Sequence, residues 1–178
     1  MLEKPNFYSV IIGTELLNGR RKDAHFAFLN QQLLSRGWEQ KASFVINDNT
    51  NLMENIFNLI KSDPNSVMFC FGGIGATPDD YTRVVAGKVF RDGKMEFHEE
   101  AKNRILNQFG TEAYPHRINM AYLPINAKLL KNVVNNVAGF YLEDRFFFTP
   151  GFPSMSQAMV IEALDKLYPK SNIEKYRR

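Results

Sequence analysis

Three short apolar runs alternate with two amphipathic segments in the first part of the chain. The runs cover 7–13, 41–46 and 67–71 and are rich in β-branched and aromatic residues, which predicts buried strands. Between them, apolar residues recur at three- and four-residue intervals over 23–37 and 49–60, which predicts helices. Strands that alternate with helices form βαβ units and a mainly parallel sheet. Because these strands are apolar on both faces, we expect helices on each side of the sheet, and therefore a three-layer α/β/α fold.

The second half of the chain is less regular, but its patterns predict further elements. Helices are expected from Pro78 through Val89, over 99–109, and from Pro153 to near Pro169, and strands over 120–123, 128–134 and 145–149. Asn135-Asn136 is typical of a hairpin turn. No internal repeat or linker interrupts the sequence, so we expect residues 1–178 to form a single domain with its core over about 7–168.

Charge and cysteine content narrow the class of partner. The formal net charge is +3 and the densest basic run, Arg20-Arg21-Lys22, is short, which argues against a nucleic-acid-binding face. The single cysteine, Cys70, lies inside an apolar run, which excludes a disulfide framework and predicts a buried thiol. The sequence shows neither an apolar run of membrane-spanning length nor a signal-peptide pattern, so we expect a cytoplasmic protein without a membrane partner.

Phenylalanine is unusually frequent, with 15 Phe in the chain. Most of them fall on predicted strands and helix faces, which indicates packing in the core. Phe71 and Phe152 differ because each lies beside glycines at the end of a predicted strand. Both lie in loops expected to face a ligand, and two alternatives stand for each ring: a lid over a base or pterin ring, or a plug where a polar contact was lost.

Three predicted strands end in residues that are typical of ligand-binding loops. The loops are Gly13-Thr14-Glu15, Gly72-Gly73-Ile74-Gly75, and Pro150-Gly151-Phe152-Pro153 followed by Ser154. Ligands bind beyond the carboxyl ends of parallel strands. We therefore expect these three loops to meet at one site.

The loop at 72–75 carries the most specific signal. Its three glycines allow positive φ and the close approach of a ligand, and successive N–H groups can form a nest for an anion. A helix starting near Pro78 would add its positive end. Asp79 and Asp80 then suit Mg²⁺, which binds few carboxylates together with phosphate oxygens, and Thr82 adds a hydroxyl. A glycine-rich turn with acidic helix caps is the alternative, while a Walker A ending and a third Rossmann glycine are both missing.

The remaining polar candidates carry weaker signals. Asp48 follows the second strand, where it either joins the site or caps the next helix, and Glu15 has similar alternatives. His25, His98 and His116 lack the spacing of metal ligands, and we expect them on the surface or on helices.

Four segments together resemble the molybdopterin-binding (MoaB/Mog-like) domain family, and among its members the N-terminal domain of the CinA competence/damage-inducible proteins. The segments are Ile11–Leu17 with Gly19 and Asp23, Val45–Asp48 with Ile56, Phe71–Gly75 followed by Pro78–Thr82, and Pro150–Pro153. Residues 120–124 and 132–140 also follow the CinA pattern of a hairpin-like insertion. The resemblance spans about residues 7–167. Phe71 stands where the family often has threonine, so one possible phosphate donor is missing.

The resemblance implies a three-layer α/β/α fold with a small hairpin insertion, and a site built from the loop at 72–75, Asp48, Asp80 and the loop around Gly151. In the adenylyltransferase branch of the family, the matching acidic residues support transfer of AMP from Mg-ATP to molybdopterin in molybdenum cofactor biosynthesis. In the CinA branch, the similar domain is associated with metal-assisted splitting of ADP-ribose at its pyrophosphate. The family commonly assembles as dimers or trimers. Its CinA members also carry an amidase domain without a counterpart in residues 1–178, so we do not expect nicotinamide-nucleotide deamidation.

Three hypotheses about function result. The first is a Mg²⁺-dependent enzyme that cleaves a phosphoanhydride such as that of ADP-ribose, with Asp48 and Asp80 catalytic and with Asp79 and Asp80 as metal ligands. The second is molybdopterin adenylylation. The third is a non-catalytic module that binds a nucleotide or a pterin.

Overall fold

The computed structural model describes residues 2–171, and a central sheet organises them. Its strands follow the spatial order β2-β1-β3-β8-β7-β6. They are β1 (Asn6–Ile12), β2 (Gln40–Ile46), β3 (Ser66–Phe71), β6 (Lys128–Leu130), β7 (Gly139–Leu142) and β8 (Phe146–Thr149). The first three and β8 run parallel, whereas β7 is antiparallel to β8 and β6 is antiparallel to β7. The expectation of a mainly parallel sheet is confirmed.

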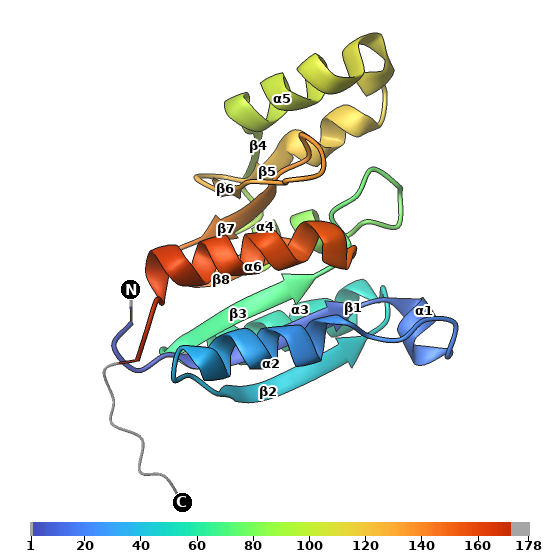
Figure 1. Cartoon of the computed structure of the whole chain (residues 1–178). Helices are drawn as coiled ribbons and strands as arrows, with labels where there is room; N and C mark the ends of the chain where they lie inside the picture. Colours follow the sequence, from blue (N-terminus) through green and yellow to red (C-terminus); the bar gives the residue numbers. More distant parts are fainter. Residues whose placement is uncertain (1, 172–178) are drawn as a thin grey trace, which may run out of the picture.

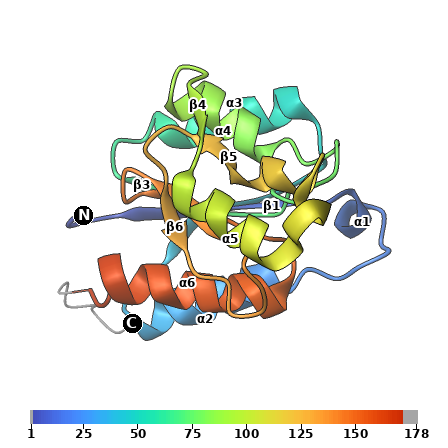
Figure 2. The ribbon, with the colours of Figure 1, turned by 90° about the horizontal axis from the view of Figure 1, so that it is seen from above.

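Helices cover both faces of this sheet, which confirms the three-layer α/β/α architecture (Figures 1 and 2). On one face, α2 (His25–Ser35) and α6 (Pro153–Leu167) pack together in one hydrophobic cluster. On the other face, α3 (Thr50–Lys61) and α4 (Thr82–Phe90) belong to a second cluster. The amphipathic spacing read from the sequence thus places each helix over a strand surface that is itself apolar.

Most of the phenylalanines fill these two clusters. Phe69 and Phe147 are neighbours in the β3–β8 register and stack at 4.8 Å between ring centroids on the α2–α6 side. Phe146 and Phe148 project to the opposite side because successive strand residues alternate faces, and both contact Phe90 of α4. The aromatic content therefore serves mainly as core, as predicted. Cys70 is also fully buried, and burial raises the pKa of its thiol.

Between α4 and β8 the chain builds more than a hairpin. The segment contains β4 (Met95–Phe97), α5 (Glu99–Phe109), the 3-10 turns Gly110–Ala113 and Arg117–Ala121, and β5 (Tyr122–Pro124), before β6 and β7. β4 and β5 form a separate antiparallel pair. In Figure 1, α5 lies at the far end of this insertion from α2 and β2. The α5 helix was predicted correctly, whereas β4 and β7 were missed.

Two predicted strand bounds within the insertion are wrong. The run at 120–123 begins inside a 3-10 turn and is extended only from Tyr122. The strand expected over 128–134 ends at Leu130, because Asn132 accepts hydrogen bonds from the backbone N–H groups of Val134 and Asn135 and folds 131–138 into a loop. None of the helices in the described residues is long and apolar enough to cross a membrane.

Candidate functional site

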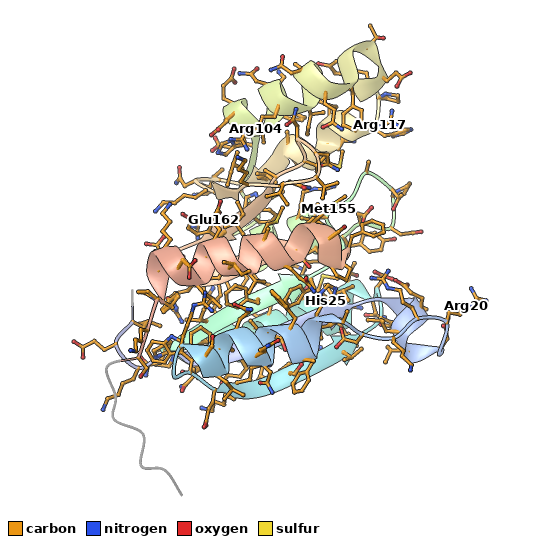
Figure 3. The ribbon with its side chains drawn as sticks, viewed as in Figure 1. Arg20, His25, Arg104, Arg117, Met155 and Glu162 are labelled. Atoms are coloured by element: carbon orange, nitrogen blue, oxygen red, sulfur yellow. The ribbon has the colours of Figure 1, made fainter. Side chains whose placement is uncertain are left out.

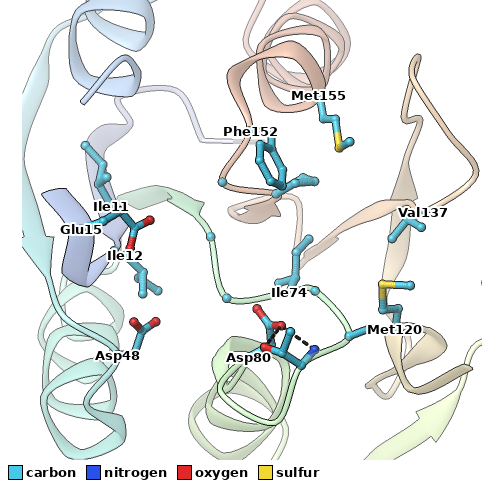
Figure 4. Close-up of a pocket in the computed structure, with 18 of the residues that line it drawn as sticks. Ile11, Ile12, Glu15, Asp48, Ile74, Asp80, Met120, Val137, Phe152 and Met155 are labelled. Carbon is cyan, nitrogen blue, oxygen red and sulfur yellow. Dashed lines mark hydrogen bonds between the residues drawn. The ribbon is translucent and has the colours of Figure 1, made fainter. Parts of the chain in front are cut away.

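A cavity of about 490 Å³ opens at the carboxyl ends of β1, β3 and β8 (Figure 4). The loops that follow these three strands meet there, as expected from the parallel arrangement. The polar part of the lining comes from Gly13, Glu15, Arg21, His25, Asp48, Gly72, Gly73, Gly75, Thr77, Asp80, Asn135 and Gly151. The apolar part includes Ile74, Phe109, Met120, Val137, Phe152 and Met155. The pocket therefore joins a polar side to an apolar wall.

The start of α4 holds three successive carbonyl groups of the glycine loop. The hydroxyl of Thr82 donates to the carbonyl oxygen of Gly72 at 3.0 Å, and the Thr82 N–H donates to that of Gly73 at 3.0 Å. The guanidinium of Arg83 donates from Nη1 to the carbonyl oxygen of Ile74. All three carbonyls are thereby turned toward α4.

This arrangement determines where the next N–H groups of the loop point. In a trans peptide the N–H is antiparallel to the C=O of the same unit. The N–H groups of residues 73–75 therefore point away from α4, and no acceptor for them lies within the described part of the chain. Consecutive N–H groups aimed to one side form a concave anion-binding surface. The loop thus has the N–H arrangement that the predicted nest requires, and anion binding there stays a prediction.

Two of the loop glycines are required by the geometry. Gly72 and Gly73 have φ of 102° and 74°, which side chains rarely adopt. A Cβ on Gly73 would lie 2.0 Å from Thr82 Oγ1, and one on Gly72 would lie 2.7 Å from the carbonyl oxygen of Ile12. The loop can approach β1 at Gly72 and α4 at Gly73 this closely only because the side chains are absent.

Asp80 closes a turn ahead of α4 and corrects the predicted helix start. Its Oδ2 accepts from the N–H of Thr77 at 2.8 Å and from the Thr77 hydroxyl at 2.7 Å. Because this turn occupies 77–80, α4 begins at Thr82 and not at Pro78. Asp80 Oδ1 has no donor among the described residues and the side chain lines the pocket. Asp79 is exposed and does not line it.

A buried arginine lies behind the same loop. Burial lowers the pKa of Arg83 to about 10, while the negative charge of Asp80 acts in the opposite direction. The guanidinium therefore stays charged near neutral pH. It places one positive charge under the loop, on the side opposite to the free N–H groups.

The loop after β8 is held by two side chains from the chain's first third. The carbonyl oxygen of Gly151 accepts from Arg21 Nη2 at 2.8 Å and from His25 Nε2 at 2.9 Å. Since a carbonyl can only accept, Nε2 carries the proton, and Nδ1 is free to accept from the hydroxyl of Ser156 at 3.5 Å. The N–H of Phe152 belongs to the same peptide unit and is antiparallel to this carbonyl, so it points away from Arg21 and His25.

Of the two positions expected for His25, surface or helix, the structure shows the helix, because His25 begins α2 and is buried. The side chain is only 3% exposed, lines the pocket, and lies flat on the ring of Phe71. Burial lowers the pKa of His25, against the opposing effects of the Gly151 carbonyl and of Asp23. No sequence pattern indicated that His25 is buried, because Phe71 and Gly151, which it contacts, lie far from it in the chain.

Phe71 and Phe152, the two rings singled out in the sequence, lie in different surroundings. Phe71 is buried and stacks on His25, which excludes it as a lid and leaves the alternative of a plug. Phe152 is 60% exposed and lines the pocket, with the Arg21 guanidinium 6.0 Å from its ring centroid. Only Phe152 can serve as a lid in this structure.

Asp48 and Glu15 line the pocket from the side of β1 and β2 (Figure 4). Asp48 Oδ2 accepts from the Thr14 hydroxyl at 3.1 Å, and Glu15 pairs with Arg21 at 3.7 Å. Asn49, rather than Asp48, caps α3 by accepting from a backbone N–H. The capping alternative for Asp48 is therefore excluded, and its carboxylate remains at the pocket.

Five of the predicted site residues do not line the cavity. They are Thr14, Asp79, Thr82, Pro153 and Ser154. Thr14 and Thr82 still act on the site through the hydrogen bonds described above. Sequence reasoning missed the apolar wall formed by Phe109, Met120, Val137 and Met155, because isolated apolar residues in an insertion look the same whether they face a core or a pocket.

Comparisons with known proteins identify the family and the fold of this chain. The family model described as a probable molybdopterin binding domain matches residues 9–169. The chain belongs to this family. A CinA-like protein of Geotalea uraniireducens is 33% identical over 161 residues, which cover 86% of this chain and 37% of that protein. A Pyrococcus horikoshii protein is 30% identical over 182 residues, covering 93% of this chain and 70% of its own length.

Solved structures show the same fold. A crystal structure of the protein CinA with unknown function from Thermoplasma acidophilum superimposes with a TM-score of 0.81 at 24% identity, covering 93% of this chain and 98% of that one. The tungsten cofactor synthesizing protein MoaB from Pyrococcus furiosus gives a TM-score of 0.56 at 17% identity, with 93% of each chain covered. The chain spans only 64% of a Caldivirga maquilingensis relative and 37% of the Geotalea protein.

Proposed function

We propose that the pocket binds the phosphate groups of a nucleotide or pterin and that, with Mg²⁺, it cleaves a phosphoanhydride such as that of ADP-ribose. One observation carries this proposal: three consecutive carbonyls are held against α4, which leaves the N–H groups of residues 73–75 on the opposite side. Preorganised N–H donors stabilise negative charge without having to reorient during a reaction. The substrate class follows the resemblance to the CinA branch, which implied metal-assisted splitting of ADP-ribose, and CinA-like proteins are among the relatives.

The apolar wall supports a ligand that carries a flat ring. Met120 and Val137 from the insertion and Phe152 and Met155 at the start of α6 line the same cavity (Figure 4). Thioether and aromatic groups pack well on the faces of heteroaromatic rings. A ligand whose phosphate binds the glycine loop and whose base or pterin ring packs on this wall would contact both the polar and the apolar side of the pocket.

The residues present fit a magnesium ion that substrate phosphates help to coordinate. Asp80 lines the pocket beside Gly75, and its Oδ1 accepts no hydrogen bond from residues 2–171. Mg²⁺ commonly binds through one or two carboxylates and keeps substrate phosphates and waters as its other ligands. When bound, the ion would offset charge on the phosphate oxygens. Asp80 is the residue that we assign to hold it, and exposed Asp79 is not.

The remaining steps are assigned to residues of the chain. Hydrolysis forms a bond between a water oxygen and phosphorus and breaks the bond to the bridging oxygen, which keeps the bonding electron pair and leaves with the other phosphate. The proton that the attacking water loses passes to the solvent. In the proposal, the N–H groups of 73–75 and the charge of Arg83 stabilise the phosphoryl oxygens as this occurs. Asp48, with Oδ2 held by Thr14, is assigned to orient the attacking water through its other oxygen.

The test is hydrolysis of ADP-ribose with and without Mg²⁺, measured as release of AMP and ribose 5-phosphate. We expect Mg²⁺-dependent turnover that Asp80→Asn reduces by about a hundredfold or more, in the range of losses seen for catalytic electrostatic groups. Asp79→Asn is the matched control, since it removes the neighbouring carboxylate outside the pocket and should retain activity. Absent turnover in the unaltered protein, or equal turnover in Asp80→Asn, would contradict the proposal.

Molybdopterin adenylylation is the second candidate, favoured by the family and by an apolar wall that also suits a pterin. It predicts pyrophosphate release from ATP only when molybdopterin is added. Nucleotide-dependent thermal stabilisation without turnover in either assay would instead identify a non-catalytic binding module.

We also propose that the chain forms a homo-oligomer, a dimer or trimer. The edge strand β2 carries exposed Val45, and α3 beside it carries exposed Leu59. Apolar side chains at an open sheet edge favour association. Light scattering coupled to size-exclusion chromatography tests this, and a monomer at all concentrations would contradict it.

A further inference from the structure

A second cavity, of about 400 Å³, lies away from the glycine loop, between α5, the β6–β7 edge of the sheet and α6. It shares no lining residue with the first pocket. Arg104 of α5 and Glu162 of α6 lie on its two sides (Figure 3). The cavity is within the size range of small-molecule sites.

Cations outnumber carboxylates around this cavity. Its lining contains the positive groups Arg104, Lys128, Lys131 and Lys166, against the carboxylates of Glu100 and Glu162. These side chains come from three separate parts of the chain, which the fold brings together. A cavity lined by an excess of one charge concentrates the opposite ion.

Only part of this positive charge is neutralised within the protein. Arg104 pairs with Glu100, and Lys128 pairs with Asp144 at 3.2 Å. Glu162 Oε1 accepts from the backbone N–H of Lys131 at 3.2 Å. The ammonium groups of Lys131 and Lys166 form no ion pair with any described residue. The negative charges of Glu162 and Asp144 still act on Lys166. With Asp144 counted beside Glu100 and Glu162, four cations face three carboxylates, so the cavity keeps an excess of one positive charge.

A buried tyrosine supplies a hydroxyl donor beside them. Tyr141 is only 3% exposed, and its ring stacks on Phe147 at 5.2 Å between centroids. Its hydroxyl oxygen accepts from Lys166 Nζ at 3.2 Å. Since Lys166 can only donate, the phenolic hydrogen is not used in this contact, and it finds no acceptor among residues 2–171. Rigid packing of the ring fixes this donor at the cavity.

We propose that this cavity is a second binding site, for a small phosphate-bearing metabolite. A phosphate oxygen that accepts from the Tyr141 hydroxyl would lie beside the Lys166 ammonium, and the Lys131 ammonium would supply a further positive charge at the cavity. Charge-assisted hydrogen bonds from lysine to phosphate are strong, and lysine acts there as a point charge that tolerates varied geometry. The site is independent of the proposed activity at the glycine loop.

The experiment is a titration of the isotope-labelled full chain with pyrophosphate, followed by amide chemical shifts, with potassium chloride at matched ionic strength as the salt control. We expect saturable shifts at the amides of Lys131, Tyr141 and Lys166. Tyr141→Phe and Lys166→Met should each weaken this binding about tenfold, the equivalent of one charge-assisted hydrogen bond. Lys88→Met is the control: it removes an exposed lysine of α4, away from this cavity, and should leave the affinity for pyrophosphate unchanged.

Several outcomes would overturn the site. They are the absence of saturable shifts at these amides, equal shifts with potassium chloride, and unchanged affinity in both cavity variants. Tighter binding of citrate than of pyrophosphate would overturn the assignment to phosphate. The amides of Gly73 and Gly75 report separately on binding at the glycine loop. The absence of binding at that loop would therefore not affect the interpretation of shifts at the second cavity. Tyr141→Phe keeps the ring that packs on Phe147, so the variant should retain the fold.

Discussion

The imidazole of His25 stacks on the ring of Phe71, with 4.3 Å between the ring centroids and 15° between their planes. His25 begins α2, whereas Phe71 ends β3, immediately before the glycine loop. The same imidazole donates to the carbonyl of Gly151. One side chain thus connects the first helix layer to both loops that form the pocket.

This contact predicts how stability changes with pH. Burial lowers the pKa of His25 in the folded protein below its unfolded value of about 6.5, so the folded state favours the neutral ring. The stabilisation is complete above the unfolded pKa and is lost as pH falls through it toward the folded pKa. Urea unfolding of the unaltered protein should therefore show a free energy of unfolding that decreases from about pH 8 to about pH 5.

His25→Gln provides the comparison, because glutamine keeps an amide donor and does not titrate in this range. Its free energy of unfolding should depend less on pH over the same interval. An identical pH dependence in both proteins would show that other groups, and not His25, cause the loss.

Gly73→Ala tests the close contact between the glycine loop and α4. The new methyl would lie 2.0 Å from Thr82 Oγ1 at a backbone φ of 74°. Gly93→Ala is a matched control, since Gly93 has a φ of 78° but no atom lies within 4 Å of the position that its new methyl would take. The control should lose about 1 kcal/mol from backbone strain alone, and Gly73→Ala about 1–3 kcal/mol more from overpacking. Equal losses in urea unfolding would mean that the loop moves aside without cost.

Arg83→Met tests whether the buried guanidinium orients the loop. The substitution leaves the Ile74 carbonyl without its donor, which should cost about 1–3 kcal/mol of stability. With one positive charge and one orienting bond removed, affinity for pyrophosphate at the Gly75 amide should fall about tenfold. Arg83→Lys keeps the charge but not the planar donor. Its affinity for pyrophosphate should therefore lie between those of the unaltered protein and Arg83→Met. Full affinity in Arg83→Met would show that the loop holds its shape without this contact.

Phe152→Ala separates ligand stacking from stability. Because the ring is largely exposed, its removal should change the free energy of unfolding by less than about 0.5 kcal/mol. If it covers a base, nucleotide affinity should fall by the equivalent of about 1–3 kcal/mol. Phe26→Ala, at an exposed ring of α2 outside the pocket, should leave affinity unchanged. Urea unfolding measures the stability and calorimetric titration with ADP-ribose the affinity, and equal affinities would remove Phe152 from the ligand site.

Errors in the sequence-based prediction concentrate where side-chain hydrogen bonds override the apolar pattern. The helix expected from Pro78 starts at Thr82 because the Asp80 carboxylate accepts from Thr77 and closes a turn. The strand expected through Val134 stops at Leu130 because the Asn132 side chain competes for backbone N–H groups. In both cases a short polar side chain offers the backbone an alternative partner, and apolar periodicity does not record it.

The sequence by itself determined the alternation of strands and helices, the mainly parallel sheet, the place of the glycine loop, and the likeness to the molybdopterin-binding family. These are local properties, since periodicity and glycine spacing are set within a few turns of chain. Only the tertiary structure decided that His25 is buried against Phe71, that Thr82 and Arg83 turn the loop carbonyls, and that the insertion supplies an apolar wall. Such contacts join residues far apart in the chain, as His25 and Gly151 are, and packing alone determines which side chains meet.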